Sequence, residues 1–277
     1  RGVDKLDLNI PQGSVTGLLG LNGSGKTTAI KLLLGHLLPN SGTVTVWDQD
    51  PAEMSPLLRS RIAYVADQAA LPLWMSLQEG MELYASYFPS WDASRARELL
   101  KQFELPMERR YAALSKGQQR LFFLFLALAQ QPELLVLDEP AGGLDTVIRR
   151  EFIDLLADLA QTREVTVLLS SHILSDVERI MDHVAFIHEG RSILQEDFNV
   201  VRDQTKRLEG MNATAENYIR NHFTVLTEHV GSTGTQFIVN DFAESKVSGV
   251  ECTVEHVDLE DIFLAYHGTA QAPTDVL

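Results

Sequence analysis

Hydrophobic residues follow two different periods along the first two thirds of the chain. Short, nearly continuous apolar runs, which are typical of buried strands, occur at Ser14–Leu19, Ile62–Val65, Leu134–Leu137 and Val165–Leu169. Longer segments with apolar residues at helical spacing lie at Lys26–Leu38, Val147–Leu159 and Ile173–Met181. Apolar strands that alternate with helices indicate a largely parallel sheet covered on both faces. The pattern therefore predicts an α/β fold.

Four other segments are predicted as shorter strands, at Leu6–Ile10, Thr43–Trp47, Val184–Ile187 and Ser192–Gln195. The last two flank the turn residues Glu189-Gly190-Arg191. They predict a terminal strand pair, and hence an antiparallel β portion beside the parallel sheet.

The middle and the end of the chain differ from this core. From about residue 70 to 130 the pattern is helical and is punctuated by Pro72, Pro89 and Pro106, which predicts an inserted α-helical subdomain. Beyond residue 200 we expect three short strands and a closing helix, at Phe223–His229, Thr235–Asn240, Glu251–His256 and Leu259–Tyr266. We therefore predict a main domain over residues 1–200 and a small C-terminal α/β accessory domain over 201–277. The accessory domain either regulates the protein, helps it to dimerise or is a structural cap.

A glycine-rich loop follows the first buried strand. The pattern G-x-x-x-x-G-K-[ST] is met by Gly20, Gly25, Lys26 and Thr27. The glycines let successive backbone N–H groups point at phosphate oxygens, and the helix that starts near Lys26 adds the positive end of its dipole. Lys26 is placed to reach the β- and γ-phosphates, and the Thr27 hydroxyl to reach Mg²⁺. The loop predicts nucleotide binding.

Two acids follow another buried strand. Asp138 and Glu139 come directly after Leu134–Leu137. A phosphate loop requires a carboxylate at the end of a neighbouring strand to hold the metal, and Asp138 stands in that place. Glu139 lies one residue further on, where it would face the γ-phosphate and polarise the attacking water as general base.

Composition narrows the setting of this chemistry. The 277 residues include 38 acidic and 23 basic side chains, a net charge of −15, whereas a nucleic-acid binder normally shows a basic stripe. Nucleic acid is therefore not expected as a partner. The single cysteine, Cys252, excludes an intramolecular disulfide, and a reducing cytosol is the simplest setting. The longest apolar run, Leu121–Ala129, is shorter than the ~20 residues that span a bilayer.

Further motifs complete a family pattern. Leu114–Gln118 reads LSKGQ and resembles the LSGGQ signature of the ABC ATPases. Gln68 is similar to the Q-loop glutamine of that family, Ala141–Asp145 to its D-loop and His172 to its switch histidine. The resemblance covers roughly residues 5–195. Four stretches narrow it to the ATPase subunits of bacterial exporters, in a branch called YtrB-like: Phe88–Asp92, Leu114–Gln118 with its lysine, Ser170–Glu178 and Leu259–Phe263.

The resemblance implies a P-loop NTPase core and an ATP-hydrolysing subunit that works in pairs. Each ATP would lie between the phosphate loop of one copy and the signature of a second copy, or of a homologous subunit. The ATP contacts would be Asn22, Gly23, Ser24, Gly25, Lys26, Thr27, Thr28, Ser115, Gly117 and Gln118. The catalytic residues would be Lys26, Gln68, Glu139 and His172, and the Mg²⁺ contacts Thr27, Gln68 and Asp138. The subunit would bind an integral membrane permease at the cytoplasmic face of the cell membrane.

Three features depart from the family pattern. Lys116 stands where the commonest signature has glycine, and it adds charge to the phosphate site only if it points inward. Ala141-Gly142 replaces the more usual Ser/Thr-Ser/Gly opening of the D-loop. The family's adenine-stacking aromatic residue lies upstream of the phosphate loop, but Arg1–Ile10 contains none. Either that residue precedes Arg1 or the base is held in another way.

The segment after Gln68 corresponds to the family's contact with its membrane subunit. Here Ala69–Trp91 is dense in aromatic residues, leucine and methionine, as protein interfaces often are. The alternative is that most of these residues simply build the core of the helical subdomain, and the sequence favours neither interpretation over the other. Leu73 and Trp74 are the favoured contacts.

Two other function classes are weaker hypotheses. The first is a non-transport ABC ATPase that acts on a cytosolic partner. A chromosome-maintenance protein of this kind needs a long heptad insertion, for which Lys26 to Asp138 leaves no room, and a translation factor normally carries two cassettes. The second is a kinase or GTPase, which the signature and His172 disfavour.

Overall fold

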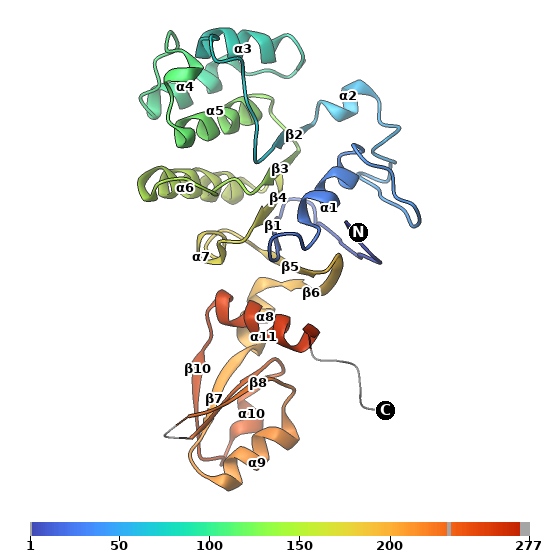
Figure 1. Ribbon diagram of the computed structural model, residues 1–277, viewed down its shortest axis with the longest axis vertical. Coiled ribbons are helices and arrows are strands. Elements are labelled where there is room, and N and C mark those ends of the chain that lie inside the picture. The colour runs from blue at the N-terminus through green and yellow to red at the C-terminus, as the bar shows by residue number, and fades with distance from the viewer. Residues whose placement is uncertain (1, 232–233, 272–277) are drawn as a thin grey trace.

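Two sheets, each with its own helices, organise the chain, and the computed structural model describes residues 2–231 and 234–271 (Figure 1). The strands of the larger sheet are β1 (Val15–Leu19), β2 (Ile62–Val65), β3 (Leu134–Asp138), β4 (Thr166–Ser171), β5 (His183–His188) and β6 (Arg191–Asp197). They lie in the order β2-β3-β4-β1-β5-β6, and all neighbours are parallel except β5 and β6. The predicted α/β class, with a mainly parallel sheet and an antiparallel portion, is confirmed.

Helices cover both faces of this sheet (Figure 1). On one side lie α1 (Lys26–Leu33) and α2 (Pro56–Arg59), and on the other lie α5 (Lys116–Ala129), α6 (Thr146–Thr162) and α7 (Leu174–Val177). Leu18 belongs to the apolar cluster around α1, whereas Leu19 belongs to the cluster that contains α5 and α6. Successive residues of one strand thus point into two separate cores, which explains why the central strands are apolar throughout.

The inserted segment is helical. It contains α3 (Leu77–Ala85), α4 (Ala93–Gln102), the 3-10 helix η1 (Tyr111–Ala113) and α5. Ser76 and Glu79 form a reciprocal capping box at the start of α3, and the Asp92 carboxylate caps α4. The whole apolar run Leu121–Ala129 is buried within α5. No helix in the described ranges is long and apolar enough to cross a membrane.

The C-terminal region forms the second sheet. Its elements are α8 (Phe198–Gln204), β7 (Lys206–Gly210), α9 (Ala213–His222), β8 (Val225–Val230), β9 (Thr235–Val239), α10 (Glu244–Val247) and β10 (Cys252–His256). Antiparallel strands in the order β10-β7-β9-β8 form a split βαβ arrangement. The closing helix α11 (Leu259–Gln271) returns to the larger sheet, where the ring of Phe263 meets that of Phe186 edge-on at 5.2 Å between centroids.

Two of the predicted strands are wrong. Leu6–Ile10 does alternate between half-buried and exposed residues, but no described strand pairs with it. The Gln195 side chain instead accepts a bond from the Asn9 N–H at 3.1 Å and donates to the Asn9 carbonyl at 2.8 Å. Thr43–Trp47 forms only an isolated bridge between Val46 and Gln49. In Leu6–Ile10 the alternating pattern therefore correctly predicted which side chains face inward. It did not predict a strand, because a strand also needs a neighbouring backbone to pair with.

Other elements differ in extent from the prediction. α1 ends at Leu33 rather than Leu38, because Gly35 turns the chain at φ 69° and a Cβ there would lie 2.5 Å from the Pro51 carbonyl oxygen. α7 ends at Val177 rather than Met181. β7 and α9 were not predicted, because the sequence of β7, KRLEG, offers one apolar residue and α9 is mostly polar.

Candidate active site

Three neighbouring strands bring their following loops to one edge of the sheet. β4 lies between β3 and β1, and all three are parallel. The register pairs Asp138 with Ser170, and Leu19 with Ser171. The glycine loop after β1, Glu139 after β3 and His172 after β4 therefore begin side by side at the carboxyl edge, where ligands of open α/β sheets bind.

Lys26 lies at the centre of the glycine loop. Its side chain is 6% exposed, and Nζ donates to the carbonyl oxygens of Gly20 at 2.7 Å and Leu21 at 3.3 Å. The same ammonium lies 3.1 Å from Glu139 Oε1. Gly25 has a φ of 112°, and a Cβ there would lie 2.4 Å from the Gly2 carbonyl oxygen, so this turn requires glycine.

Ser24 supplies a polar atom that the fold itself does not use. The residue is buried, and its Oγ has no hydrogen-bond partner among the residues that the structure describes. Buried hydroxyls are normally satisfied by a partner, a water or a ligand. Ser24 Oγ, the Lys26 ammonium and the N-terminus of α1 together form a set of groups that fits phosphate oxygens.

Asp138 is a buried carboxylate with two hydroxyl donors. Thr27 Oγ1 donates to Asp138 Oδ1 at 3.2 Å, and Ser170 Oγ donates to the same oxygen at 2.7 Å. Burial, and then the negative charges of Asp138 and Asp67, raise the pKa of the Tyr64 phenol to about 12. A hydroxyl and one carboxylate suit Mg²⁺, which usually takes one or two carboxylates and completes its shell with water and phosphate oxygens.

Glu139 is held on both its backbone and its side chain. Its φ of 50° lies in the left-handed region, which costs a residue with a side chain ~1–3 kcal/mol. The Glu139 N–H donates to Ser170 Oγ at 2.9 Å. Oε2 lies 2.6 Å from His172 Nδ1, and Oε1 lies 3.1 Å from Lys26 Nζ. The carboxylate is therefore fixed between a lysine and a histidine at the carboxyl edge of the sheet.

Comparison with known proteins agrees with this geometry. The sequence profile described as ABC transporter matches residues 3–142, about half of the chain. The chain belongs to the ABC transporter family. It is an ATP-binding ATPase subunit of that family, and the predicted P-loop NTPase fold is confirmed.

Curated relatives and a solved structure extend the similarity beyond the matched part. The bacitracin transport ATP-binding protein BcrA of Bacillus licheniformis is 28% identical over an alignment of 286 residues, gaps included, and the alignment covers 97% of this chain and 93% of BcrA. The ABC transporter ATP-binding protein YtrB of Bacillus subtilis (strain 168) is 28% identical over 269 residues, which cover 95% of this chain and 92% of YtrB. A structure of an ATP binding subunit of an ABC transporter superposes with a TM-score of 0.66 and 27% identity, over 73% of this chain and 86% of that one. The predicted YtrB-like branch is confirmed.

The ABC signature of this chain lies apart from its own phosphate loop. Ser115 Oγ accepts the Gln118 N–H at 3.2 Å and Gln118 Oε1 accepts the Ser115 N–H at 3.1 Å, so both residues cap their own helix α5. Gly117 is buried and Lys116 is exposed. Gln68 is exposed in the turn after β2. Within residues 2–231 and 234–271, no hydrogen bond or ion pair joins Gln68, Ser115, Gly117 or Gln118 to the phosphate loop, Asp138 or Glu139.

Two residues at this carboxyl edge have no counterpart among the predicted site residues. Ser170 bonds to both Asp138 and the Glu139 N–H, and its signal was a serine at the end of an otherwise apolar strand. Arg120 donates to the Glu139 carbonyl at 2.8 Å and to the Asp67 carboxylate at 2.7 Å. A lone arginine in the first turns of an amphipathic helix gives no such signal.

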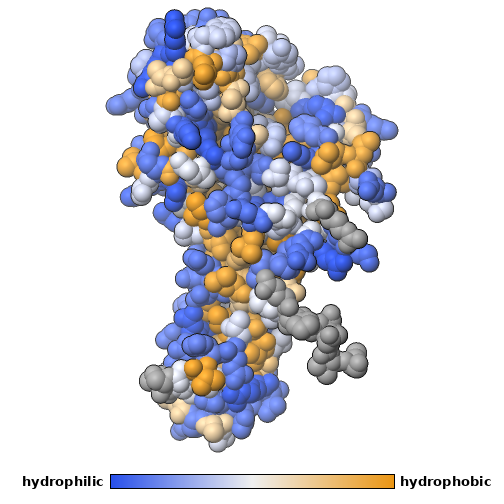
Figure 2. Space-filling model, viewed as in Figure 1, coloured by the Kyte–Doolittle hydropathy of each residue, from blue (hydrophilic) through white to orange (hydrophobic). Residues whose placement is uncertain are grey.

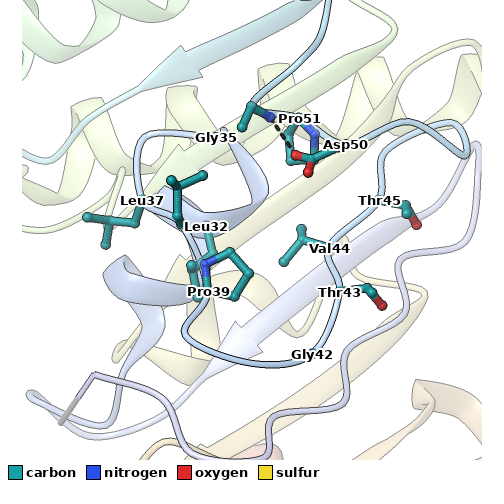
Figure 3. A pocket seen from close by; sticks show the side chains of 12 residues that line it. Leu32, Gly35, Leu37, Pro39, Gly42, Thr43, Val44, Thr45, Asp50 and Pro51 are labelled. Atoms are coloured by element: carbon teal, nitrogen blue, oxygen red, sulfur yellow. Dashed lines mark hydrogen bonds between the residues drawn. The ribbon is translucent and has the colours of Figure 1, made fainter.

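A separate hollow of about 180 Å³ lies at the other end of α1 (Figure 3). Its lining combines the end of α1 with the turns that follow, and Leu32, Leu37, Pro39 and Val44 make it largely apolar. The carboxylate of Asp50 is occupied by the Ala52 N–H at 2.8 Å. No residue of the glycine loop lines this hollow. It is therefore distinct from the candidate site at the carboxyl edge.

Proposed function

We propose that this ABC subunit hydrolyses Mg-ATP at the carboxyl edge of its larger sheet and that two copies together complete each site. The observation that carries the proposal is the Glu139 carboxylate, fixed between Lys26 and His172 at 3.1 and 2.6 Å. A base in this position faces a loop whose free polar groups suit phosphate. Hydrolysis of the terminal phosphate follows from that arrangement.

The glycine loop would hold the triphosphate. The proposed contacts of this copy are Asn22, Gly23, Ser24, Gly25, Lys26, Thr27 and Thr28. Lys26 would exchange its loop carbonyl partners for the β- and γ-phosphate oxygens, because charge-assisted bonds to phosphate are the stronger ones. Ser24 Oγ, buried without a partner in the described chain, would gain one.

Thr27 and Asp138 would hold Mg²⁺, with Gln68 as a third contact when its loop approaches. The ion would neutralise charge on the phosphate oxygens during hydrolysis. Ser170 would help to position these ligands, since its hydroxyl donates to the same Asp138 oxygen that accepts from Thr27.

Glu139 would act as general base toward the attacking water. His172 would hold the carboxylate in place and contact the γ-phosphate, and Gln68 would complete the water site. The left-handed backbone of Glu139 supports this assignment, because strained residues concentrate where geometry serves function.

The signature would act on the ATP of a second copy or of a homologous subunit. Ser115, Gly117 and Gln118 stand at the start of α5, a helix of 14 residues whose N-terminal dipole attracts anions. These residues make no contact with their own glycine loop in the described chain, so a neighbouring chain is the natural recipient. ATP would then join the two copies, and its hydrolysis would release them.

The joining and release of the two copies would drive a movement in an integral membrane permease that they bind. We propose that the system exports its substrate through this permease. Leu73, Trp74 and Tyr87 are 65%, 66% and 71% exposed, whereas their neighbours Leu71 and Met75 are buried. The apolar side chains after Gln68 therefore divide between core and surface. Figure 2 shows apolar side chains at the surface over this helical part, at the top of the view.

The proposed arrangement places the subunit on the cytoplasmic face of the cell membrane, bound through that permease. We also propose the domain division of the chain, with the ABC ATPase domain over residues 1–200, its helical subdomain over about 70–130, and the accessory domain over 201–277. Residues 272–277 lie outside the described ranges.

Replacing Glu139 by glutamine tests the ATPase assignment. We expect kcat of Glu139→Gln to fall at least ~100-fold, as loss of a general base does, while the Kd for ATP stays within ~3-fold of wild type. Steady-state phosphate release and fluorescent-nucleotide titration measure the two quantities. Glu133→Gln makes the same change just before β3, at its opposite end, and should leave turnover intact. Unchanged kcat in Glu139→Gln would overturn the proposal.

A further inference from the structure

Arg120 links parts of the ATPase edge that are far apart in sequence. It lies on α5, directly after the signature. Its Nη1 donates to the Glu139 carbonyl at 2.8 Å and to the Pro140 carbonyl at 3.4 Å. Its Nη2 donates to the Asp67 carboxylate at 2.7 Å and to the Asp67 carbonyl at 3.3 Å. One guanidinium therefore connects the signature helix, the loop after β2 and the loop after β3.

The D-loop leaves room for this guanidinium. A Cβ on Gly142 would lie 3.4 Å from Arg120 Nη1 and equally far from the Glu139 carbonyl oxygen. A larger side chain would extend from that contact toward the guanidinium. The glycine at position 142, which the commoner D-loop shares with serine, thus lies where Arg120 passes.

The Glu139 backbone depends on outside support. Its left-handed φ of 50° is unfavourable for a residue with a side chain, so neighbouring groups must hold it. The N–H is held by Ser170, and the carbonyl accepts from Arg120 and from the Gly142 N–H at 3.2 Å. Arg120 is thus the side chain that holds the Glu139 carbonyl. Because it fixes the Glu139 peptide, it also helps to fix the direction in which the Glu139 side chain points.

Asp67 is the chain neighbour of Gln68. A displacement of Gln68 therefore moves Asp67 as well. Arg120 is hydrogen-bonded to both the carbonyl and the carboxylate of Asp67. The Arg120 and Asp67 side chains are 24% and 45% exposed, so their ion pair adds little to stability. A planar guanidinium with fixed donors does, however, transmit position well.

We propose that Arg120 is a positioning residue that couples the Gln68 loop to the general base Glu139. The inference rests on the ATPase function proposed above. When the Gln68 loop sits in one place, Arg120 holds the Glu139 peptide in its catalytic orientation. When the loop shifts, the guanidinium releases or rotates that peptide. The loop that adjoins the proposed permease contact would thereby control hydrolysis.

Kinetics of Arg120 variants in the full-length protein test the coupling. We expect Arg120→Ala to lower kcat about tenfold while KM for ATP changes less than about twofold, because orientation of the base is lost and binding groups are intact. Arg120→Lys should stay near the alanine value, since a single ammonium nitrogen does not replace the two separate, fixed guanidinium nitrogens that reach the two loops. Asp67→Asn keeps an acceptor oxygen and should lose less activity than Asp67→Ala.

Arg61→Ala is the matched control. Arg61 bonds to Glu133 with Nε and Nη2, and this pair joins the same two strands, β2 and β3, at their opposite ends. Thermal unfolding is measured for all variants. If Arg120 has only a structural role, Arg61→Ala and Arg120→Ala should lower Tm to a similar extent, and Arg120→Ala should not lower kcat selectively while KM stays constant. Wild-type kcat in a folded Arg120→Ala protein would overturn the coupling. Absence of ATPase activity in the wild type would instead overturn the proposed function.

Discussion

This ABC subunit buries one lysine beside its larger sheet and another within its second sheet, and the two lysines have different partners. At the start of α1, Lys26 is 5% exposed and lies among carbonyls of the glycine loop and the Glu139 carboxylate. In the accessory sheet Lys206 is 7% exposed, donates to the Arg202 carbonyl of α8 at 2.8 Å and lies 3.1 Å from His256 Nδ1. Lys206 satisfies the end of a helix, whereas Lys26 lies beside groups that a ligand would replace.

The difference teaches that burial of a charge does not by itself mark a functional site. Lys206 completes a C-terminal helix cap, which is a structural task. Around Lys26 the fold leaves Ser24 Oγ without a partner in the described chain and keeps Glu139 in a strained backbone conformation. An unpartnered hydroxyl alone does not separate the two regions, because Thr205 Oγ1 beside Lys206 is also buried without a partner in the described chain. What marks the proposed ATPase edge is that Ser24 Oγ, the Lys26 ammonium and the strained Glu139 come together in one place.

Removal of the first lysine should have the largest effect. We expect Lys26→Ala to weaken ATP binding at least ~100-fold, because a desolvated charge-assisted contact with the phosphates is lost. Titration with a fluorescent ATP analogue measures this. ATP affinity that stays at the wild-type value in a folded Lys26→Ala protein would refute the role of the loop.

Lys206→Met makes the comparison sharp. Loss of the ammonium leaves the Arg202 carbonyl without its donor and should cost about 1–2 kcal/mol of unfolding free energy. ATP affinity and kcat should remain at wild-type values, because α8 and β10 lie outside the proposed ATPase edge. Urea denaturation and phosphate release measure the two effects. If Lys206→Met lost ATP turnover while its free energy of unfolding stayed unchanged, the contrast between a structural Lys206 and a functional Lys26 would be wrong.

The smallest effect concerns Glu178, which follows α7 and lies beside α11. Burial, and then the negative charge of Asp258, raise the pKa of the Glu178 carboxyl above its ordinary 4.5, although the Leu259 N–H opposes the shift. A raised pKa in the folded state means that the protonated form fits best. Its contribution to stability is full below pH ~4.5 and is lost as the pH rises through the raised value.

Glu178→Gln keeps an acceptor for the Leu259 N–H and removes the charge. At pH 7 the variant should unfold about 1–2 °C higher than wild type, a small shift because Glu178 is partly exposed. At pH 4 the difference should vanish, since wild-type Glu178 is then protonated. Differential scanning calorimetry at both pH values decides. An equal difference at pH 4 and pH 7 would contradict the assigned cause.

The residues of the candidate site that belong to continuous motifs could be proposed from the sequence. Lys26, Thr27, Asp138, Glu139 and His172 follow buried strands, and adjacency of those strands brings them together. Contacts made across the fold could not be predicted in this way. The pairing of Arg120 with Asp67 depends on where α5 lies against β2, and no local pattern encodes that position.

The same limit applies to the fold. Strands with apolar residues on both faces were predicted well, because burial on two sides leaves a continuous signal. Leu6–Ile10 and Thr43–Trp47 were mistaken for strands, since alternation reports exposure and not pairing. β7 was missed for the opposite reason, as it pairs on both sides with few apolar residues.

The central claim is that two copies complete each ATP site. Light scattering during size-exclusion chromatography of Glu139→Gln, with and without Mg-ATP, tests it most directly. The account predicts a monomer without nucleotide and a dimer of twice the mass with Mg-ATP, because ATP that is bound and not hydrolysed keeps the two copies joined. A variant that binds ATP and stays monomeric at saturating Mg-ATP, beside a wild type that hydrolyses ATP as a monomer, would contradict it.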